Sequence, residues 1–159
     1  MKWFVEIDGG AKGSPALDAS ENVYVGGADS LLYKVSSSGT AVWTCALGDS
    51  VGESSPVLST TSDLVIIGAN NGILYAASTT ASSCSSFTWT YTTGGAIRSS
   101  PLIDDYGTVF VGSRDGYVHA VRENDGTLLW KTASNGNDDF DASPVIDRHE
   151  STISCCRII

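Results

Sequence analysis

The feature that most constrains this chain is an internal repeat, marked by a Ser-Pro dipeptide followed by apolar residues. The four copies read GSPALD, SSPVLS, SSPLID and ASPVID, and their prolines are Pro15, Pro56, Pro101 and Pro144. The steps between these prolines are therefore 41, 45 and 43 residues. A period of this length indicates one supersecondary unit that recurs along the chain and buries its apolar faces against neighbouring copies.

Two further landmarks keep the same step. The four tryptophans of the chain are Trp3, Trp43, Trp89 and Trp130, and the steps between them are 40, 46 and 41 residues. A run rich in Val and Ile that ends in glycine recurs between them as VYVGG, LVIIG and TVFVG. Because three different landmarks recur with nearly the same step, the pattern indicates a true internal repeat and not a chance recurrence of one motif.

Each unit predicts four short β-strands. In the third copy, the segments PLID, TVFVGS, YVHAV and TLLWKT are rich in β-branched and aromatic side chains, and the Asp-Gly pairs Asp115-Gly116 and Asp125-Gly126 favour tight turns between them. A recurring four-stranded meander of this length is typical of a β-propeller blade. We therefore expect an all-β propeller in which the tryptophan of each fourth strand packs against the next blade.

The stretch SSPLID…TVFVGSRDGYVHAVRENDGTLLW resembles the pyrroloquinoline-quinone (PQQ) repeat of the quinoprotein dehydrogenase-like propellers, and Ser14–Trp43 matches nearly as well. The Trp-Asp pair of WD repeats is absent from this register. The resemblance extends from Trp3 to about Asp147. The middle copy departs from it, with 13 residues between Tyr75 and Trp89 against nine in the first copy, so we expect an enlarged loop there with Cys84 at its tip.

The repeat predicts an incomplete propeller, an arc that covers residues 1–147. Propellers of the resembled family have seven or eight blades, so we expect a fragment of a longer chain. An alternative closes a ring of four blades by joining the two partial strands into one composite blade. The expected segments are three complete blades at about 14–47, 55–92 and 100–132, partial strands of flanking blades at 2–7 and 143–147, and an off-pattern tail at 148–159 that lacks the next second strand.

Charge and apolar content exclude some functions. The formal net charge of -9 repels phosphate backbones, so no nucleic-acid partner is expected. No apolar run approaches the ~18 residues that span a membrane, and the apolar stretch within the start MKWFVEIDGG is shorter than a secretory signal requires. The resembled family is mostly periplasmic, secreted or membrane-attached. The cysteines follow no zinc spacing, and their redox state stays open: Cys45, Cys84, Cys155 and Cys156.

A candidate site is expected where loops gather at one end of the blades. Because meander strands alternate in direction, the inter-blade loops share an end with the turns between second and third strands, and loops commonly carry binding residues. The inter-blade loops are Asp8–Gly13, Gly48–Ser54, Thr93–Ser99 and Ala133–Ala142. We expect a mixed surface with an acidic rim, and we assign no catalytic, cofactor-binding or metal-binding residue there. Its charged residues are Asp8, Lys12, Asp29, Asp49, Glu53, Arg98, Arg114, Asp115, Asp138, Asp139 and Asp141.

Two features of these loops have competing interpretations. The segment NDDFD lacks the Asp-x-Asp-x-Asp-Gly order and the distant Glu of a calcium-binding EF-hand, so we interpret it as a solvated acidic loop. Arg98 precedes a Ser-Ser-Pro and could approach an anion on the propeller axis. We expect it instead to pair with Asp138 or Asp139 on the neighbouring loop.

The histidines and the paired cysteines suggest no catalytic site. His119 occupies the register of Tyr33 and Tyr75, which predicts a packed, hydrogen-bonded histidine, and neither it nor His149 has a recognisable Ser or Cys partner. Some quinoprotein dehydrogenases place a disulfide between adjacent cysteines against the quinone. Here the pair at 155–156 lies outside the repeat and lacks the accompanying Glu, Asn and Asp ligands, so we interpret it as a coincidence.

These observations leave three functional hypotheses. The first is a non-catalytic propeller module that acts as a binding or assembly platform. Its partner would be a protein or the remaining blades of a parent propeller, and its open blade faces favour self-association. The alternative, implied by the resemblance, is part of a PQQ- and calcium-dependent alcohol or sugar dehydrogenase, although three blades cannot enclose that cofactor. The third is that the fragment has no function by itself. Whether the parent is an enzyme stays uncertain.

Overall fold

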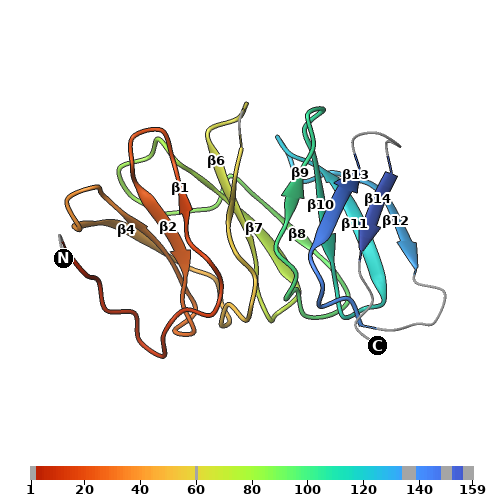
Figure 1. Ribbon diagram of the computed structural model, residues 1–159, viewed down its shortest axis with the longest axis horizontal. Helices are drawn as coiled ribbons and strands as arrows, with labels where there is room; N and C mark the ends of the chain where they lie inside the picture. Colours follow the sequence, from red (N-terminus) through yellow and green to blue (C-terminus); the bar gives the residue numbers. More distant parts are fainter. Residues whose placement is uncertain (1–2, 60, 134–138, 148–151, 156–159) are drawn as a thin grey trace.

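The computed structural model describes residues 3–59, 61–133, 139–147 and 152–155 and shows an all-β arrangement. Three four-stranded antiparallel sheets stand side by side in chain order, followed by a two-stranded hairpin (Figure 1). This confirms the predicted fold class, an incomplete propeller of three blades. Within the described ranges, no helix is long and apolar enough to cross a membrane.

The strands of each blade follow one another as a meander. The first blade contains β1 (Ala16–Leu17), β2 (Val23–Gly26), β3 (Leu31–Val35) and β4 (Ala41–Ala46). The second contains β5 (Val57–Leu58), β6 (Leu64–Gly68), β7 (Ile73–Ser78) and β8 (Trp89–Thr92). The third contains β9 (Leu102–Ile103), β10 (Thr108–Gly112), β11 (Tyr117–Arg122) and β12 (Leu128–Ala133). The hairpin consists of β13 (Pro144–Asp147) and β14 (Thr152–Cys155).

The middle blade is covered on both faces, and alternation along β6 sorts its side chains between the two neighbours. Val65 and Ile67 belong to the core shared with the first blade, whereas Leu64 and Ile66 belong to the core shared with the third. All five residues of β6 are buried, in contrast to β12, whose six residues are all exposed. The apolar core therefore lies between the blades, as the repeat requires.

A tryptophan links each blade to the next. The indole N–H of Trp43 donates to the Ala81 carbonyl at 3.1 Å, and that of Trp89 donates to the Glu123 carbonyl at 2.7 Å. The acceptor lies in both cases between the third and fourth strands of the following blade. The two tryptophans are 6% and 8% exposed, which confirms the predicted packing against the next blade.

Two of the tryptophans rest on a glycine of the following turn. A Cβ built on Gly126 would lie 2.6 Å from Cε3 of the Trp89 ring, and one on Gly39 would overlap the ring of Trp3. Both glycines also have positive φ, +70° and +84°, which L-residues with side chains rarely adopt. A glycine is therefore required in this turn for two reasons: it leaves space for the tryptophan ring, and it adopts the positive φ of the turn.

The Ser-Pro dipeptides form a second series of contacts between blades. The backbone N–H of Ser14 donates to Oγ of Ser55 at 2.8 Å, and that of Ser55 donates to Oγ of Ser100 at 2.9 Å. The N–H of Ser100 donates in turn to Oγ of Ser143, also at 2.9 Å. Ser55 and Ser100 therefore each accept a hydrogen bond from the preceding blade and donate one to the following blade. This explains why the dipeptide recurs.

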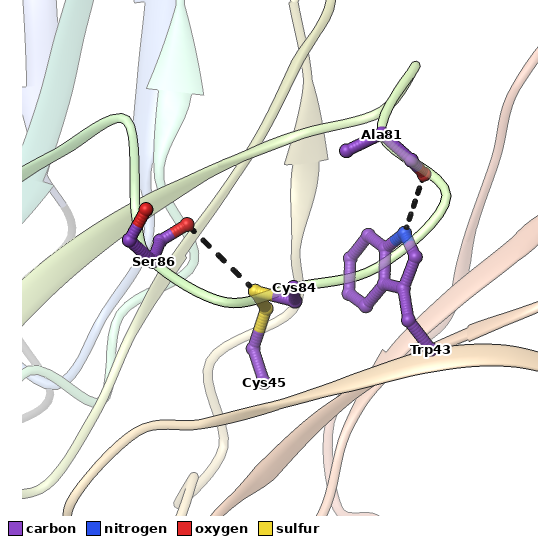
Figure 2. The surroundings of a disulfide bond; sticks show 5 residues. All are labelled: Trp43, Cys45, Ala81, Cys84 and Ser86. Atoms are coloured by element: carbon purple, nitrogen blue, oxygen red, sulfur yellow. Dashed lines mark hydrogen bonds between the residues drawn. A yellow bond between two sulfur atoms is a disulfide. The ribbon is translucent and has the colours of Figure 1, made fainter.

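The joint between the first two blades differs from the others. The connection from β7 to β8 spans residues 79–88, which confirms the enlarged loop predicted for the middle copy. Cys84 in this loop forms a disulfide with Cys45 of β4, beside the hydrogen bond from Trp43 to Ala81 (Figure 2). The Lys34 ammonium donates to the Thr79 carbonyl of the same loop at 2.6 Å. With the Tyr24 hydroxyl, which also donates to the Thr79 carbonyl, four side chains of the first blade contact the loop.

Residues 3–7, the described part of the partial strand predicted at 2–7, pair with no sheet of the described chain. The other strands of the blade to which it would belong are not among the described residues. Trp3 nevertheless donates its indole N–H to the Ser37 carbonyl at 2.8 Å, as the other joint tryptophans do. Residues 3–7 and the β13–β14 hairpin lie at opposite ends of the row of blades (Figure 1), so the alternative of a composite blade that closes four is wrong.

The chain continues the pattern beyond the third blade. β13 contains the expected first strand, and β14 pairs with it in antiparallel register from Asp147–Thr152 to Pro144–Cys155. The expectation that the tail lacks a second strand is therefore wrong. Backbone pairing requires only residues that tolerate an extended conformation, such as Thr152 and Ile153, and does not require the Val-Gly motif.

The tryptophan joint predicts a difference between two matched substitutions. Trp89→Ala should lower the free energy of unfolding by about 3–5 kcal/mol, because it removes a buried ring and leaves the Glu123 carbonyl without its donor. Trp130→Ala should cost no more than about 1 kcal/mol, because that ring is 43% exposed. Urea unfolding followed by circular dichroism measures both. Equal losses would show that contact with the next blade is not what stabilises the ring.

The disulfide predicts that the middle joint is sensitive to reductant. It closes a loop with a sequence separation of 39 residues, for which chain entropy alone corresponds to about 4 kcal/mol. Dithiothreitol should therefore lower the urea midpoint of the native chain, with the loss in hydrogen-exchange protection greatest at residues 79–88. The Cys45→Ser/Cys84→Ser variant serves as the control and should not respond to reductant. An unchanged midpoint in the native chain would contradict the cross-link.

Candidate docking face at the inter-blade loops

The inter-blade loops and the turns between second and third strands meet at one end of the blades, which we call the loop face. Backbone hydrogen bonds join them: the N–H of Val51 donates to the Gly27 carbonyl at 3.1 Å, and that of Ile97 donates to the Ala69 carbonyl at 3.0 Å. The last inter-blade loop makes the same contact, from the Phe140 N–H to the Ser113 carbonyl at 3.3 Å. The expected clustering of these segments is confirmed.

The glycine that ends each second strand leaves space for an apolar residue of the adjacent inter-blade loop. Val51, Ile97 and Phe140 each insert beside one of these glycines, and a Cβ there would overlap the inserted residue. Val51 and Ile97 are 2% and 0% exposed, so the loops are fastened by apolar packing as well as by backbone hydrogen bonds. The three glycines are Gly26, Gly68 and Gly112.

Arg114 pairs with acidic residues of the last inter-blade loop, Ala133–Ala142. Its Nε and Nη2 donate to the two carboxylate oxygens of Asp141 at 2.8 and 2.6 Å, and its Nε lies 3.7 Å from Oδ2 of Asp139. These hydrogen bonds hold the pKa of Asp141 below its usual value. The arginine that pairs with Asp139 is thus Arg114 and not Arg98, contrary to our expectation, because Arg114 lies on the turn hydrogen-bonded to this loop. Asp138 lies outside the described residues.

Arg98 and Asn70 carry buried polar atoms without a partner in the part of the chain that the structure describes. These atoms are Nε of Arg98, a donor, and Oδ1 of Asn70, an acceptor. Both side chains flank Gly52, where a Cβ would lie 2.9 Å from Oδ1 of Asn70 and 3.4 Å from Cγ of Arg98. Buried polar groups are usually hydrogen-bonded, so an unpaired donor and an unpaired acceptor beside one glycine distinguish this place on the loop face; a third such atom, Oε1 of Glu123, lies at the opposite end of the blades.

His119 is part of a polar network between the second and third blades. It is 1% exposed, with Nδ1 2.9 Å from the Tyr91 hydroxyl and Nε2 3.1 Å from both carboxylate oxygens of Asp115. A neutral histidine protonated at Nε2 satisfies all of these contacts. Burial raises the pKa of Asp115, but hydrogen bonds from the Gly94 N–H and His119 lower it below its usual value. The expected packed, hydrogen-bonded histidine is confirmed.

The remaining predicted residues do not form a common site. Asp29 accepts from the Tyr33 hydroxyl, and burial together with this carboxylate raises the pKa of Tyr33 to about 12. Asp49 accepts from the Ser50 N–H at 2.7 Å within its own loop. Asp8, Lys12 and Glu53 are exposed, and His149 and Cys156 fall outside the described residues. Within those residues, no three His, Cys, Asp or Glu side chains gather closely enough to hold a metal ion.

The end opposite the loop face carries a feature that our sequence reasoning missed. A cavity of about 620 Å³ lies between the first and second blades and is lined by Asp18, Lys34 and Asp63 among others. Lys34 is only 7% exposed and pairs across the sheet with Trp43, whereas Ala76 stands opposite Trp89 and Ala120 opposite Trp130. A lysine where the other repeats have alanine was the signal that could have found it.

Comparison with known proteins identifies the family. The sequence model of the PQQ-repeat family described as "Outer membrane protein assembly factor BamB" matches residues 2–155. BamB from Moraxella catarrhalis is 25% identical, with a TM-score of 0.73 over 87% of this chain and 42% of that one. The chain therefore spans less than half the length of this relative. No curated protein matched in a sequence search.

Two further solved structures share the fold alone. The quinohemoprotein alcohol dehydrogenase from Comamonas testosteroni is 21% identical, with a TM-score of 0.65 over 79% of this chain and 21% of that one. The computationally designed Ika4 protein is 14% identical, with a TM-score of 0.72 over 96% and 94%. Together with the Trp joints, the Ser-Pro contacts and the match over residues 2–155, these comparisons show that the chain belongs to the PQQ-repeat β-propeller family that includes BamB.

Proposed function

We propose that this chain is a non-catalytic β-propeller module that serves as a binding or assembly platform, and that a protein partner docks on its loop face. The observation that carries the proposal is the buried pair of unsatisfied atoms, Nε of Arg98 and Oδ1 of Asn70, on either side of Gly52. Because both atoms are buried beside Gly52, a partner reaches them only by displacing this segment of the loop; its main chain then offers a carbonyl for the donor and an N–H for the acceptor.

The charges around this pair set the kind of partner. Asp139 is 58% exposed, and Asp141 and Arg114 are about one-third exposed, so they form a charged border on the loop face. The net charge of the chain is -9. A partner surface with basic side chains beside an accessible main-chain segment complements this border and is steered toward it.

The family supports an assembly role. The matching family model is described as an outer membrane protein assembly factor. Of the three solved structures compared above, BamB has the highest sequence identity to this chain, 25%. The Cys45–Cys84 disulfide favours an oxidising compartment, because such bonds persist there and are rare in the cytosol. Because the chain spans 42% of BamB, we propose that the platform works as part of a larger propeller.

The alternative of a PQQ- and calcium-dependent dehydrogenase fits the described residues poorly. No group of three potential metal-ligating side chains is found among them, and the Asp141 carboxylate is already held by Arg114 through two hydrogen bonds. The quinohemoprotein dehydrogenase structures, which are 21% and 18% identical, support a shared fold alone. A visible absorbance change when PQQ and calcium are added would favour this alternative.

The docking proposal can be tested by site-specific cross-linking in the native host. A photo-reactive amino acid at Glu53, on the loop face, should capture a discrete protein, whereas one at Tyr106, which is 94% exposed on a turn at the other end, should not. Arg98→Ala should reduce the Glu53 cross-link at least about tenfold, because it removes the unpaired donor.

Arg122→Ala provides the matched control, since Arg122 is an arginine near the end opposite the loop face, half-exposed and paired with Asp125. It should leave the cross-link from position 53 intact. Capture from position 106 alone, or equal loss with the two arginine variants, would reject the loop face as the docking surface.

A further inference from the structure

The β13–β14 hairpin forms the first two strands of a further blade, and no third or fourth strand follows them in the described chain. Ser143 continues the series of serine contacts, and β13 lies beside β10 of the third blade. β14 pairs with β13, and no strand of the described chain pairs with its other edge. Trp130 is 43% exposed, and its neighbours Leu128 and Leu129 are 41% and 42% exposed. An open strand edge and an uncovered apolar strand thus lie at the same end of the row.

The joint one blade earlier shows what covers such a surface. There the β11–β12 hairpin pairs with β10 through five residue pairs, from Thr108–Arg122 to Gly112–Val118. Its turn supplies the Glu123 carbonyl to the indole of Trp89 and places Gly126 under the ring. One hairpin therefore satisfies a strand edge and a tryptophan at the same time.

We infer that β14 and Trp130 together form a docking site for a β-hairpin that carries the third and fourth strands of this same repeat. The first strand of the hairpin adds to the free edge of β14, as in recognition by β-strand addition. Its turn contains a glycine that lies under the Trp130 ring and a carbonyl that accepts the indole N–H. This site is distinct from the loop face and does not depend on the function proposed there.

Other occupants fulfil only part of these requirements. A single strand pairs with β14 but provides no turn for Trp130, and a flat apolar surface provides no carbonyl for the indole. A second copy of the chain has a suitable seat on its first blade, but its own Trp3 already donates to the Ser37 carbonyl and lies over Gly39. The hairpin is the occupant for which the chain itself shows the complete set of contacts.

A synthetic peptide tests the inference. It copies residues 116–133 of this chain with Trp130→Phe in the peptide, so that every tryptophan signal comes from the protein. We expect saturable binding to the intact chain by calorimetry and a blue shift of tryptophan emission as Trp130 becomes shielded. The Trp130→Ala protein, whose fold is checked by circular dichroism, should lose the emission shift and bind the peptide at least about tenfold more weakly.

Two altered peptides separate the two halves of the site. A peptide with Gly126→Val should bind weakly because its side chain meets the Trp130 ring, and one with His119→Pro should bind weakly because its first strand is interrupted. Absence of saturable binding, or binding that is indifferent to Trp130 and to both peptide changes, overturns the inference. A dimer of the chain that the peptide cannot displace also overturns it, since the site would then belong to a second copy.

Discussion

The hydrogen bond from a tryptophan indole to a carbonyl of the next blade is the contact on which the rest of the structure depends. A four-stranded meander alone has too little core to be stable, and most of its apolar side chains face its neighbours. The indoles of Trp43 and Trp89 anchor those neighbours at the outer strands, while Ser55 and Ser100 anchor them at the inner strands. With both edges held, the apolar faces between blades have one way to pack.

The joint between the first and second blades shows how this contact tolerates variation. The enlarged loop of the second blade lacks the glycine turn on which Trp3 and Trp89 rest, yet Trp43 still finds a carbonyl at Ala81. The Cys45–Cys84 bond and the Lys34 ammonium attach the same loop to the first blade. A covalent bond and an extra hydrogen bond thus accompany the one joint where the regular turn has been lost.

The sequence was informative wherever a contact recurs in every blade. Ser-Pro, the terminal glycine of the second strand and the tryptophan each mark such a contact, and together they predicted the three blades and the gathering of loops at one end. Contacts that occur once could not be predicted: the partner of Cys84, the choice of Asp139 by Arg114, and the unpaired atoms of Arg98 and Asn70 depend on individual loop conformations. β14 was missed because a strand at a sheet edge requires backbone pairing and no motif.

The joints also have a direction, since each blade donates from its fourth-strand tryptophan and accepts at the turn before its own fourth strand. Duplication or deletion of one whole repeat in the gene therefore leaves every surviving junction with one indole donor and one carbonyl acceptor. Only a change at the first joint also separates Cys45 from Cys84 and Lys34 from Thr79. A point mutation acts differently, because a tryptophan and the turn it rests on lie in successive repeats. Evolution can thus change the number of blades in whole steps, while a tryptophan and the following turn must vary together.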